Sequence, residues 1–167
     1  MTRHFGEKII LPAVGLLILV ADQISKYLVL SSLNPGQSWN PIASLTPWVS
    51  ITHVTNTGAA FGLFPAQGSL LAVIAVIVVA AIILYYRQLP VGQWWIKVSL
   101  GLQLGGALGN LLDRLRLGYV IDFIDFKIWP VFNLADSSIV IGVAILAYYL
   151  LRDRGEEENG EHVVQEG

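Results

Sequence analysis

The stretch that decides the fold is residues 105–138, which reads GGALGNLLDRLRLGYVIDFIDFKIWPVFNLADSS. It places four carboxylates between two long apolar runs, and these are Asp113, Asp122, Asp125 and Asp136. An ionised side chain inside a bilayer or at its edge costs several kcal/mol, so acidic residues there need a functional reason. We therefore interpret the stretch as the end of one membrane helix, a functional site, and the start of the next helix.

The composition indicates an integral membrane protein. Of 167 residues, 54% are hydrophobic and only 13% are charged, which is too apolar for a soluble domain of this size. Cysteine is absent, which excludes disulfides, a thiol nucleophile and a thiolate metal site. The three His residues lie far apart and no His-Glu-x-x-His motif occurs, so a zinc protease has no ligands.

Four apolar runs are long enough to form transmembrane helices. A helix rising about 1.5 Å per residue needs roughly twenty apolar residues to cross about 30 Å of hydrocarbon. We predict spans at residues 9–30, 70–86, 94–112 and 134–151. A cleavable signal peptide is the alternative for the first, because Arg3 and Lys8 precede it, but the run is too long and no cleavage site follows. Glycines recur at helical spacing in the third span and would allow close helix contact, namely Gly101, Gly105, Gly106 and Gly109.

The positions of Lys and Arg predict the orientation. They cluster near both termini and between the second and third spans, and residues 31–67 carry none. Both termini are therefore expected in the cytoplasm. We predict a single catalytic membrane domain at residues 1–152 and a disordered acidic cytoplasmic tail at residues 153–167. The basic residues that would lie outside are interpreted as partners of the carboxylates, namely Arg114, Arg116 and Lys127.

The first outer connection predicts a small extracytoplasmic β-platform. Pro35, Pro41 and Pro47 break any helix in the first part of residues 31–67, and the alternation in residues 49–55 predicts a short strand. In the segment that follows, small residues allow close backbone approach, and Asn56 offers both a donor and an acceptor. The predicted fold class is an all-α membrane protein with four transmembrane helices and this platform between the first and the second.

This topology brings ionisable residues of separate segments to one level. Asp22 and Lys26 lie near the outer end of the first span, one turn apart on the same face. Asp113 ends the third span, Asp122 lies in the short connection that follows, and Asp136 begins the fourth span. Five separately placed ionisable side chains therefore converge, which predicts a functional site near the outer leaflet.

Asp122 and Asp136 are the candidates for a catalytic pair. Two carboxyl groups that share one site cannot both ionise cheaply, so one is protonated and the other charged near neutral pH. The charged member can take a proton from water as it attacks a peptide carbonyl, and the protonated member can donate to the carbonyl oxygen. The simpler interpretation is that each aspartate caps the start of a helix, where Asp is favoured.

Three other functions fit parts of the pattern. A serine–lysine protease would use Ser25, Ser137 or Ser138 with Lys26 as the base. A membrane phosphotransferase would hold Mg²⁺ with its aspartates. A proton-coupled transporter would relay protons through intramembrane carboxylates, although the sequence shows no internal repeat.

Five sequence blocks together resemble the bacterial lipoprotein signal peptidase family, also called signal peptidase II. In order they are DQxxK at 22–26, NTGAAFG at 56–62, GGALGNLLDR at 105–114, VxDF at 120–123 and FNxADS at 132–137. The resemblance implies that Asp122 and Asp136 are paired catalytic aspartates. It also implies that the enzyme removes the signal peptide of a prolipoprotein by cleaving before the diacylglyceryl-modified cysteine.

The resemblance further implies roles in supporting the pair or holding substrate for Asp22, Lys26, Asn56, Gly105, Asn110, Asp113, Arg114 and Asn133. From the residues alone, Arg114 is explained equally well as a structural partner of Asp113, and Asp22 with Lys26 as an intrahelical pair. Asp125 is interpreted as an interfacial surface charge. The expected partners are lipid-modified prolipoproteins and membrane lipids, with no metal, cofactor or nucleic acid. We expect a monomer in the bacterial cytoplasmic (inner) membrane.

Overall fold

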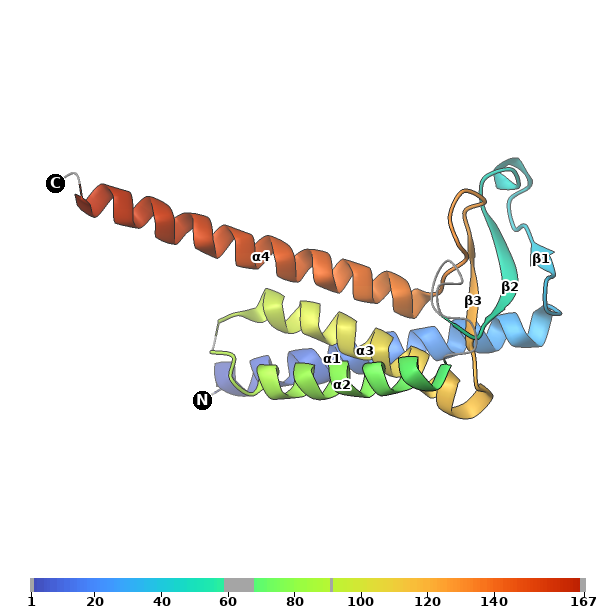
Figure 1. Cartoon of the computed structure of the whole chain (residues 1–167), viewed down its shortest axis with the longest axis horizontal. Helices are drawn as coiled ribbons and strands as arrows, with labels where there is room; N and C mark the ends of the chain where they lie inside the picture. Colours follow the sequence, from blue (N-terminus) through green and yellow to red (C-terminus); the bar gives the residue numbers. More distant parts are fainter. Residues whose placement is uncertain (1, 59–67, 91, 166–167) are drawn as a thin grey trace.

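The computed structural model contains four long helices and a small sheet at one end of them (Figure 1). It describes residues 2–58, 68–90 and 92–165, of which 2–6 and 153–165 are described by their backbone only. The elements in chain order are α1 (Thr2–Ser32), β1 (Ser38–Trp39), η1 (Ala43–Leu45), β2 (Ser50–Asn56), α2 (Gly68–Tyr86), α3 (Trp94–Leu117), β3 (Val120–Asp125) and α4 (Leu134–Gln165).

Three helices in the described part of the chain are long and apolar enough to cross a membrane. They are α1 over Glu7–Ser32, α2 over Gly68–Tyr86 and α4 over Leu134–Arg152. Helix α3 begins at the predicted start of the third span and continues to Leu117, beyond the predicted end at residue 112. It is more polar than these three spans, because it packs against all three helices and buries Lys97, Ser99 and Asn110. A helix that is surrounded by protein tolerates such residues, so a crossing by α3 stays a prediction.

Helix α4 continues to Gln165 and so runs into the acidic segment 153–167, for which the sequence predicts disorder. The side chains of that segment lie outside the described residues, and the expectation stays a prediction. Residues 59–62 of the second sequence block also lie outside the described residues.

Two adjacent glycines let α3 approach α1 and α4. A Cβ atom on Gly105 would lie 2.5 Å from the carbonyl oxygen of Gly15 in α1, and one on Gly106 would lie 2.5 Å from the carbonyl oxygen of Ala135 in α4. Both distances are shorter than real Cβ contacts. Gly105 therefore supports the site indirectly, because it sets the spacing of α1 and α3.

Gly109 lies where the α3 backbone meets Asp22, and any Cβ atom there would overlap the Asp22 carboxylate. We predict that Gly109→Leu lowers the stability of the purified protein by about 3 kcal/mol or more, because it displaces a buried, ion-paired carboxylate. Thermal unfolding measures this effect. Gly15→Ala is the control, because its Cβ atom would make only ordinary contacts. Equal melting temperatures for Gly109→Leu and the wild type would contradict the prediction.

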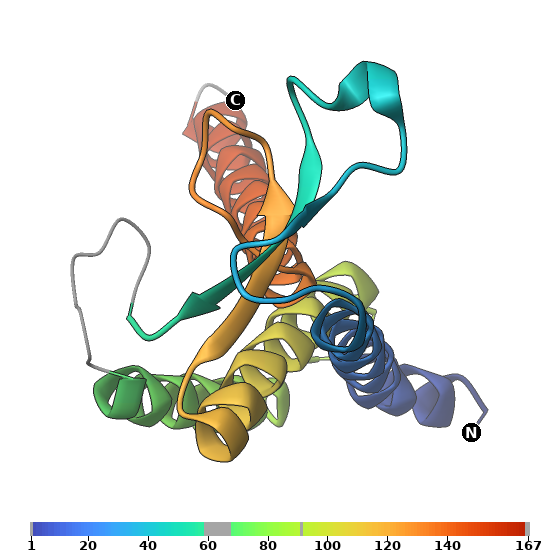
Figure 2. The same ribbon diagram turned by 90° about the vertical axis from the view of Figure 1, so that its right-hand side faces the viewer.

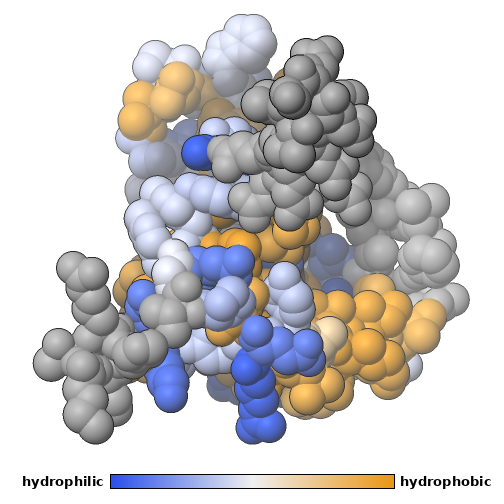
Figure 3. Space-filling model, turned by 90° about the vertical axis from the view of Figure 1, so that its left-hand side faces the viewer, coloured by the Kyte–Doolittle hydropathy of each residue, from blue (hydrophilic) through white to orange (hydrophobic). Residues whose placement is uncertain are grey.

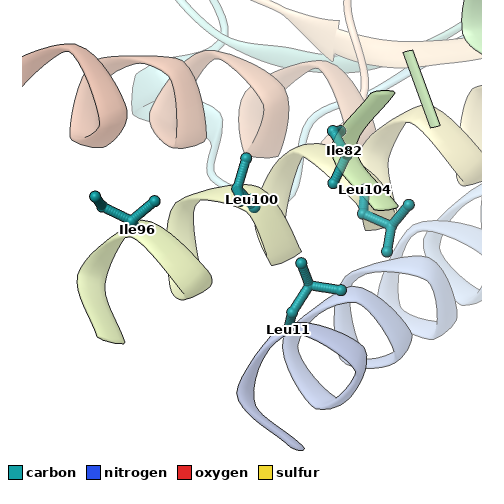
Figure 4. Packing of buried hydrophobic residues seen from close by; sticks show 5 residues of the cluster. All are labelled: Leu11, Ile82, Ile96, Leu100 and Leu104. Atoms are coloured by element: carbon teal, nitrogen blue, oxygen red, sulfur yellow. The ribbon is translucent and has the colours of Figure 1, made fainter. Parts of the chain in front are cut away.

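An apolar cluster fills the helix contacts away from the sheet (Figure 4). Its buried members come from α1, α2 and α3 and are Leu11, Ile82, Ile96, Leu100 and Leu104. Because lipid is as apolar as these side chains, close packing rather than exclusion of water stabilises the cluster. Helix α1 is thus an integral part of the core, which disfavours its interpretation as a cleavable signal peptide.

The end of the bundle where α1 begins and α2 ends shows hydrophilic residues beside hydrophobic flanks (Figure 3). There the Lys97 ammonium lies 2.7 Å from Glu7 Oε2, and the Tyr86 hydroxyl donates to the Lys8 carbonyl at 2.8 Å. Polar contacts at the end of a bundle whose sides are apolar suit a bundle that ends at a membrane surface.

A three-stranded antiparallel sheet of order β1-β2-β3 lies across the other end of the helices (Figure 2). Strand β2 begins and ends one residue after the strand predicted at 49–55. It pairs with β3 from Ser50 opposite Asp125 to Asn56 opposite Val120, with an irregularity between Ile51 and Val54.

The prediction that the platform is formed between the first two spans is only partly correct. Its third strand, β3, comes from the short connection between α3 and α4, for which we predicted no secondary structure. Five of its six residues are buried. A strand that is buried on both faces lacks a clear alternation of apolar and polar residues, which explains the missed assignment.

Candidate active site

A buried ion cluster joins α1 to α3. The Lys26 ammonium lies 2.8 Å from Asp22 Oδ2 and 2.8 Å from Asp113 Oδ2, and it donates to Asn110 Oδ1 at 3.0 Å. These contacts use all three hydrogens of the ammonium group. Because an unpaired buried charge is costly, the cluster holds α1 and α3 in one register.

The two carboxylates of this cluster also hold the elements that carry the candidate catalytic pair. Asp22 Oδ1 accepts from the Ala135 N–H at the start of α4, at 3.0 Å. Asp113 Oδ2 accepts from the Ile121 N–H in β3, at 3.2 Å. The cluster is therefore a scaffold on which both the start of α4 and the strand β3 are placed.

Gln23 belongs to this scaffold and was not predicted as a site residue. Its Nε2 donates to Asp113 Oδ1 at 3.0 Å and to Asp22 Oδ2 at 3.2 Å. It follows Asp22 directly in the first sequence block, and that position is the signal that could have identified it.

Asp122 lies in β3 and is 2% exposed. Its Oδ2 accepts from Asn56 Nδ2 at 2.8 Å, and its Oδ1 accepts from Asn133 Nδ2 at 2.7 Å. Burial is the main cause that raises the pKa of Asp122 to about 6; the nearby Asp136 also raises it, and the two amides act in the opposite direction. The helix-capping interpretation of Asp122 is wrong, because the residue lies within a strand.

Asp136 lies in the first turn of α4 and is partly exposed. Its Oδ1 accepts from Asn110 Nδ2 at 2.8 Å, and its Oδ2 accepts from the Asn133 N–H at 3.3 Å. In return, the Asp136 N–H donates to Asn133 Oδ1 at 2.9 Å, which completes a reciprocal capping pair. The helix-capping interpretation therefore accounts for Oδ2 of Asp136, whereas Oδ1 accepts from Asn110.

Three asparagine side chains direct their NH₂ groups at the two aspartates, and a donor fixes the orientation of each. In every case the amide oxygen accepts from a group that can only donate; the pairs are Gly58 N–H to Asn56, Asp136 N–H to Asn133 and Lys26 Nζ to Asn110. The amide nitrogen must then point the other way, toward a carboxylate. The chemistry of the neighbours thus determines which end of each amide faces the aspartates.

Arg114 lies beside the pair. Its Nη1 donates to the Asn110 carbonyl at 3.3 Å, and its charge interacts with Asp136, Asp122 and Asp113. Among the described residues it makes no ion pair with Asp113, which pairs with Lys26 instead. The interpretation as a structural Asp113–Arg114 pair is therefore wrong, and Arg114 remains a candidate for contact with substrate.

Asp125 lies at the far end of β3 and its side chain is buried, so it is not the interfacial surface charge that we predicted. Its Oδ2 accepts from Lys127 Nζ at 2.6 Å, Thr52 Oγ1 at 2.8 Å and Ser50 Oγ at 3.2 Å. Burial raises the pKa of Asp125, but hydrogen bonds from Lys127 and Thr52 outweigh it and lower the pKa to about 2. Asp125 ties β2 to β3 and has the predicted partner Lys127.

The serine–lysine alternative lacks the required geometry. The hydroxyl groups of Ser25, Ser137 and Ser138 donate to main-chain carbonyls, and two carboxylates hold Lys26. For the phosphotransferase alternative, no three His, Asp or Glu side chains of the described residues gather in a metal-binding group.

Comparison with known proteins gives consistent matches. A family model described as signal peptidase (SPase) II matches residues 14–152. The chain is 48% identical over 143 residues to the lipoprotein signal peptidase of Moorella thermoacetica, covering 86% of this chain and 93% of that protein. It is 46% identical over 137 residues to that of Halothermothrix orenii, covering 82% and 92%. A solved bacterial membrane enzyme superposes with a TM-score of 0.79 at 31% identity, covering 86% of this chain and 88% of that one.

Proposed function

This chain belongs to the signal peptidase II family, and from that premise we propose that it removes the signal peptides of prolipoproteins with Asp122 and Asp136 as an aspartic catalytic pair. Cleavage takes place before the diacylglyceryl-modified cysteine. One observation carries the proposal: Asn133 donates from its side chain to Asp122 and from its backbone to Asp136, so that two carboxylates from separate elements share one site.

The pair acts by general acid–base catalysis. Asp122, with its raised pKa, is the protonated member and donates its proton to the oxygen of the scissile carbonyl. Asp136 is the ionised member and takes a proton from the water that attacks the carbonyl carbon. When the tetrahedral intermediate collapses, Asp136 gives that proton to the leaving amine and Asp122 regains its own. Each carboxyl group thus returns to its starting state.

The surrounding residues position the pair and the substrate. Asn56, Asn110 and Asn133 orient the two carboxylates through their NH₂ groups. Arg114 offers donors to a main-chain carbonyl of the signal peptide. The scaffold of Asp22, Lys26 and Asp113 fixes β3 and the start of α4 through hydrogen bonds to their main-chain N–H groups.

The site lies at the sheet end of the bundle, where α1 ends and α4 begins (Figure 1). The hydrophilic opposite end, with Lys8, Arg87 and Lys97 in its sequence, faces the cytoplasm by the positive-inside rule. The active site therefore lies near the outer leaflet of the bacterial cytoplasmic membrane.

Incubation of the purified protein in detergent with a synthetic diacylglyceryl-modified prolipoprotein peptide tests the function. We predict a single cut immediately before the modified cysteine, undiminished by EDTA, because a carboxylate pair activates water without a metal. A peptide with an unmodified cysteine is the control and should be cleaved far more slowly. Loss of cleavage with EDTA, restored by Mg²⁺, would show that a metal ion activates the water and would refute the metal-free carboxylate pair.

The pH dependence of kcat/KM follows from the raised pKa of Asp122. Because the acid form of the free enzyme is lost as pH rises through about 6, we predict that kcat/KM falls about tenfold per pH unit beyond that value. Asn56 lowers the pKa of Asp122 by donating to it, so Asn56→Ala should reduce turnover and move this alkaline limb to higher pH. A reduced rate with an unmoved limb would show that Asn56 acts elsewhere, for example in the turn with Gly58.

A further inference from the structure

One end of the sheet exposes several large apolar side chains. Because Ser50 pairs with Asp125, the connection before β2 and the connection after β3 leave the sheet at the same end. We call residues 40–49 and 126–131 together the sheet tip. Its exposed large apolar side chains are Ile42, Leu45, Trp48, Phe126, Ile128 and Trp129.

The exposure of these side chains is unusual for a surface in water. Ile128 is 89% exposed, Trp48 is 67% exposed and Trp129 is 61% exposed. Lys127 is the sole charged residue in the sequence of the tip, and residues 31–67 contain no Asp, Glu, Lys or Arg. Large apolar side chains gathered at one end of a sheet with so little charge mark a contact with a protein or with a membrane.

The position of the tip favours a membrane. The strands lie across the ends of the helices, so the tip projects sideways beyond α1, α2 and α3 (Figure 2). Along the axis of the helix bundle, the tip lies near the start of α4. In the next turns of α4, Val140 is 67% exposed and Ile141 is 52% exposed. Because α4 can cross a membrane, its exposed side chains face lipid, and the tip lies beyond the end of the bundle at which this helix begins (Figure 1).

The residue types fit the interfacial layer of a bilayer. Tryptophan has an apolar body with a polar N–H group and is enriched at the level of lipid headgroups. Lys127 joins an aliphatic stem to a cation that is bound to Asp125 at 2.6 Å and is still partly exposed, so it can also meet a lipid phosphate. A protein–protein interface carries a polar rim around its apolar centre. The described residues of the nearly uncharged tip form no such rim, which disfavours a protein as its partner.

We propose that the sheet tip inserts into the headgroup layer of the outer leaflet, and that this lipid contact holds β3 in the position that catalysis requires. The tip is joined to β3 directly, and Asp125 links it to Ser50 and Thr52 of β2. Asp122 lies three residues before Asp125 on the same strand. The catalytic part of this inference rests on the proposed function, whereas the lipid contact does not.

Tryptophan fluorescence in nanodiscs tests the lipid contact. The chain has five Trp residues, so a variant that keeps Trp48 and carries Phe at the other four reports on the tip alone. We expect phospholipids brominated near the headgroup to quench Trp48 more strongly than phospholipids brominated at the chain ends. The Asp136→Asn form of this variant should give the same quenching, so this result stands even if the catalytic pair is wrong.

Introduction of negative charge into the apolar tip tests its role in catalysis. The double variant Leu45→Glu with Ile128→Glu should lose the quenching and most of its cleavage in nanodiscs. Pro35→Glu is the matched control, because Pro35 is exposed in the turn before β1, away from the tip, and it should keep both.

Three outcomes would overturn the proposal. If no brominated lipid quenched the fluorescence of Trp48 in an active protein, the tip would lie in water. Shielding of Trp48 only after addition of a prolipoprotein peptide would make the tip a protein-binding surface. Full cleavage by the double variant, after quenching has been lost, would remove the link to catalysis.

Discussion

Replacement of either Asp122 or Asp136 by Asn should reduce cleavage of a lipid-modified prolipoprotein by roughly three orders of magnitude in kcat. Asn keeps the size and polarity of Asp but cannot exchange a proton at these pH values. Each role in the proposed mechanism needs that exchange, so each single variant should be inactive. The double variant should be scarcely worse than either, because residues that act as one unit show strongly non-additive effects.

Both single variants should still fold. At position 136 the bond from the backbone N–H to Asn133 Oδ1 does not involve the side chain, so the start of α4 keeps its cap. At position 122 the amide oxygen of Asn can still accept from Asn56 or Asn133. Near-normal melting temperatures together with lost turnover would therefore separate catalysis from structure.

Asp125→Asn is the matched control for this experiment, because Asp125 is another buried aspartate on the same strand. It contacts Lys127, Thr52 and Ser50 and touches neither candidate catalytic residue. It should lower stability and retain most of the activity. Substantial cleavage by purified Asp122→Asn or Asp136→Asn would refute the pair, whatever the control shows.

The four helices could be predicted because their signal is local. A run of apolar residues identifies a helix in lipid without knowledge of its neighbours, and α1, α2 and α4 agree with that rule. Helix α3 agrees less well, since its residues face protein, and residues such as Lys97 and Asn110 have their partners on other elements. A hydropathy pattern contains no information about those partners.

The candidate catalytic residues could be selected from the sequence, but their hydrogen bonds could not. Asp113 and Arg114 are neighbours in sequence, yet Asp113 pairs with Lys26, 87 positions away. Asp122 lies in an apolar run whose strand character depends on pairing with β2. Such contacts follow from the packing of separate segments, which is why adjacency in the sequence suggested the wrong pair.

Asn133 is the residue on which the second large effect should be seen. Its amide oxygen caps α4 by accepting from the Asp136 N–H, and its amide nitrogen donates to Asp122 at 2.7 Å. The two functions can be separated, because Asp and Ser cap helices about as well as Asn but lack the NH₂ group. Asn133→Ser should therefore keep the melting temperature close to normal and reduce kcat/KM by roughly ten- to a hundredfold, because the carboxylate that forms when Asp122 gives up its proton loses a hydrogen bond.

Asn133→Asp should be the more damaging change, although it is isosteric. It places a third carboxylate against Asp122, and a like charge there raises the pKa of Asp122 further. The acid form of Asp122 then persists to higher pH, so the alkaline limb of kcat/KM should move upward relative to Asn133→Ser. At neutral pH we expect a loss of roughly a hundredfold or more, because three carboxylates in one site no longer share their protons as a pair does. If Asn133→Asp and Asn133→Ser gave the same pH profile, the amide of Asn133 would serve the helix alone, and the orientation of Asp122 would depend on Asn56.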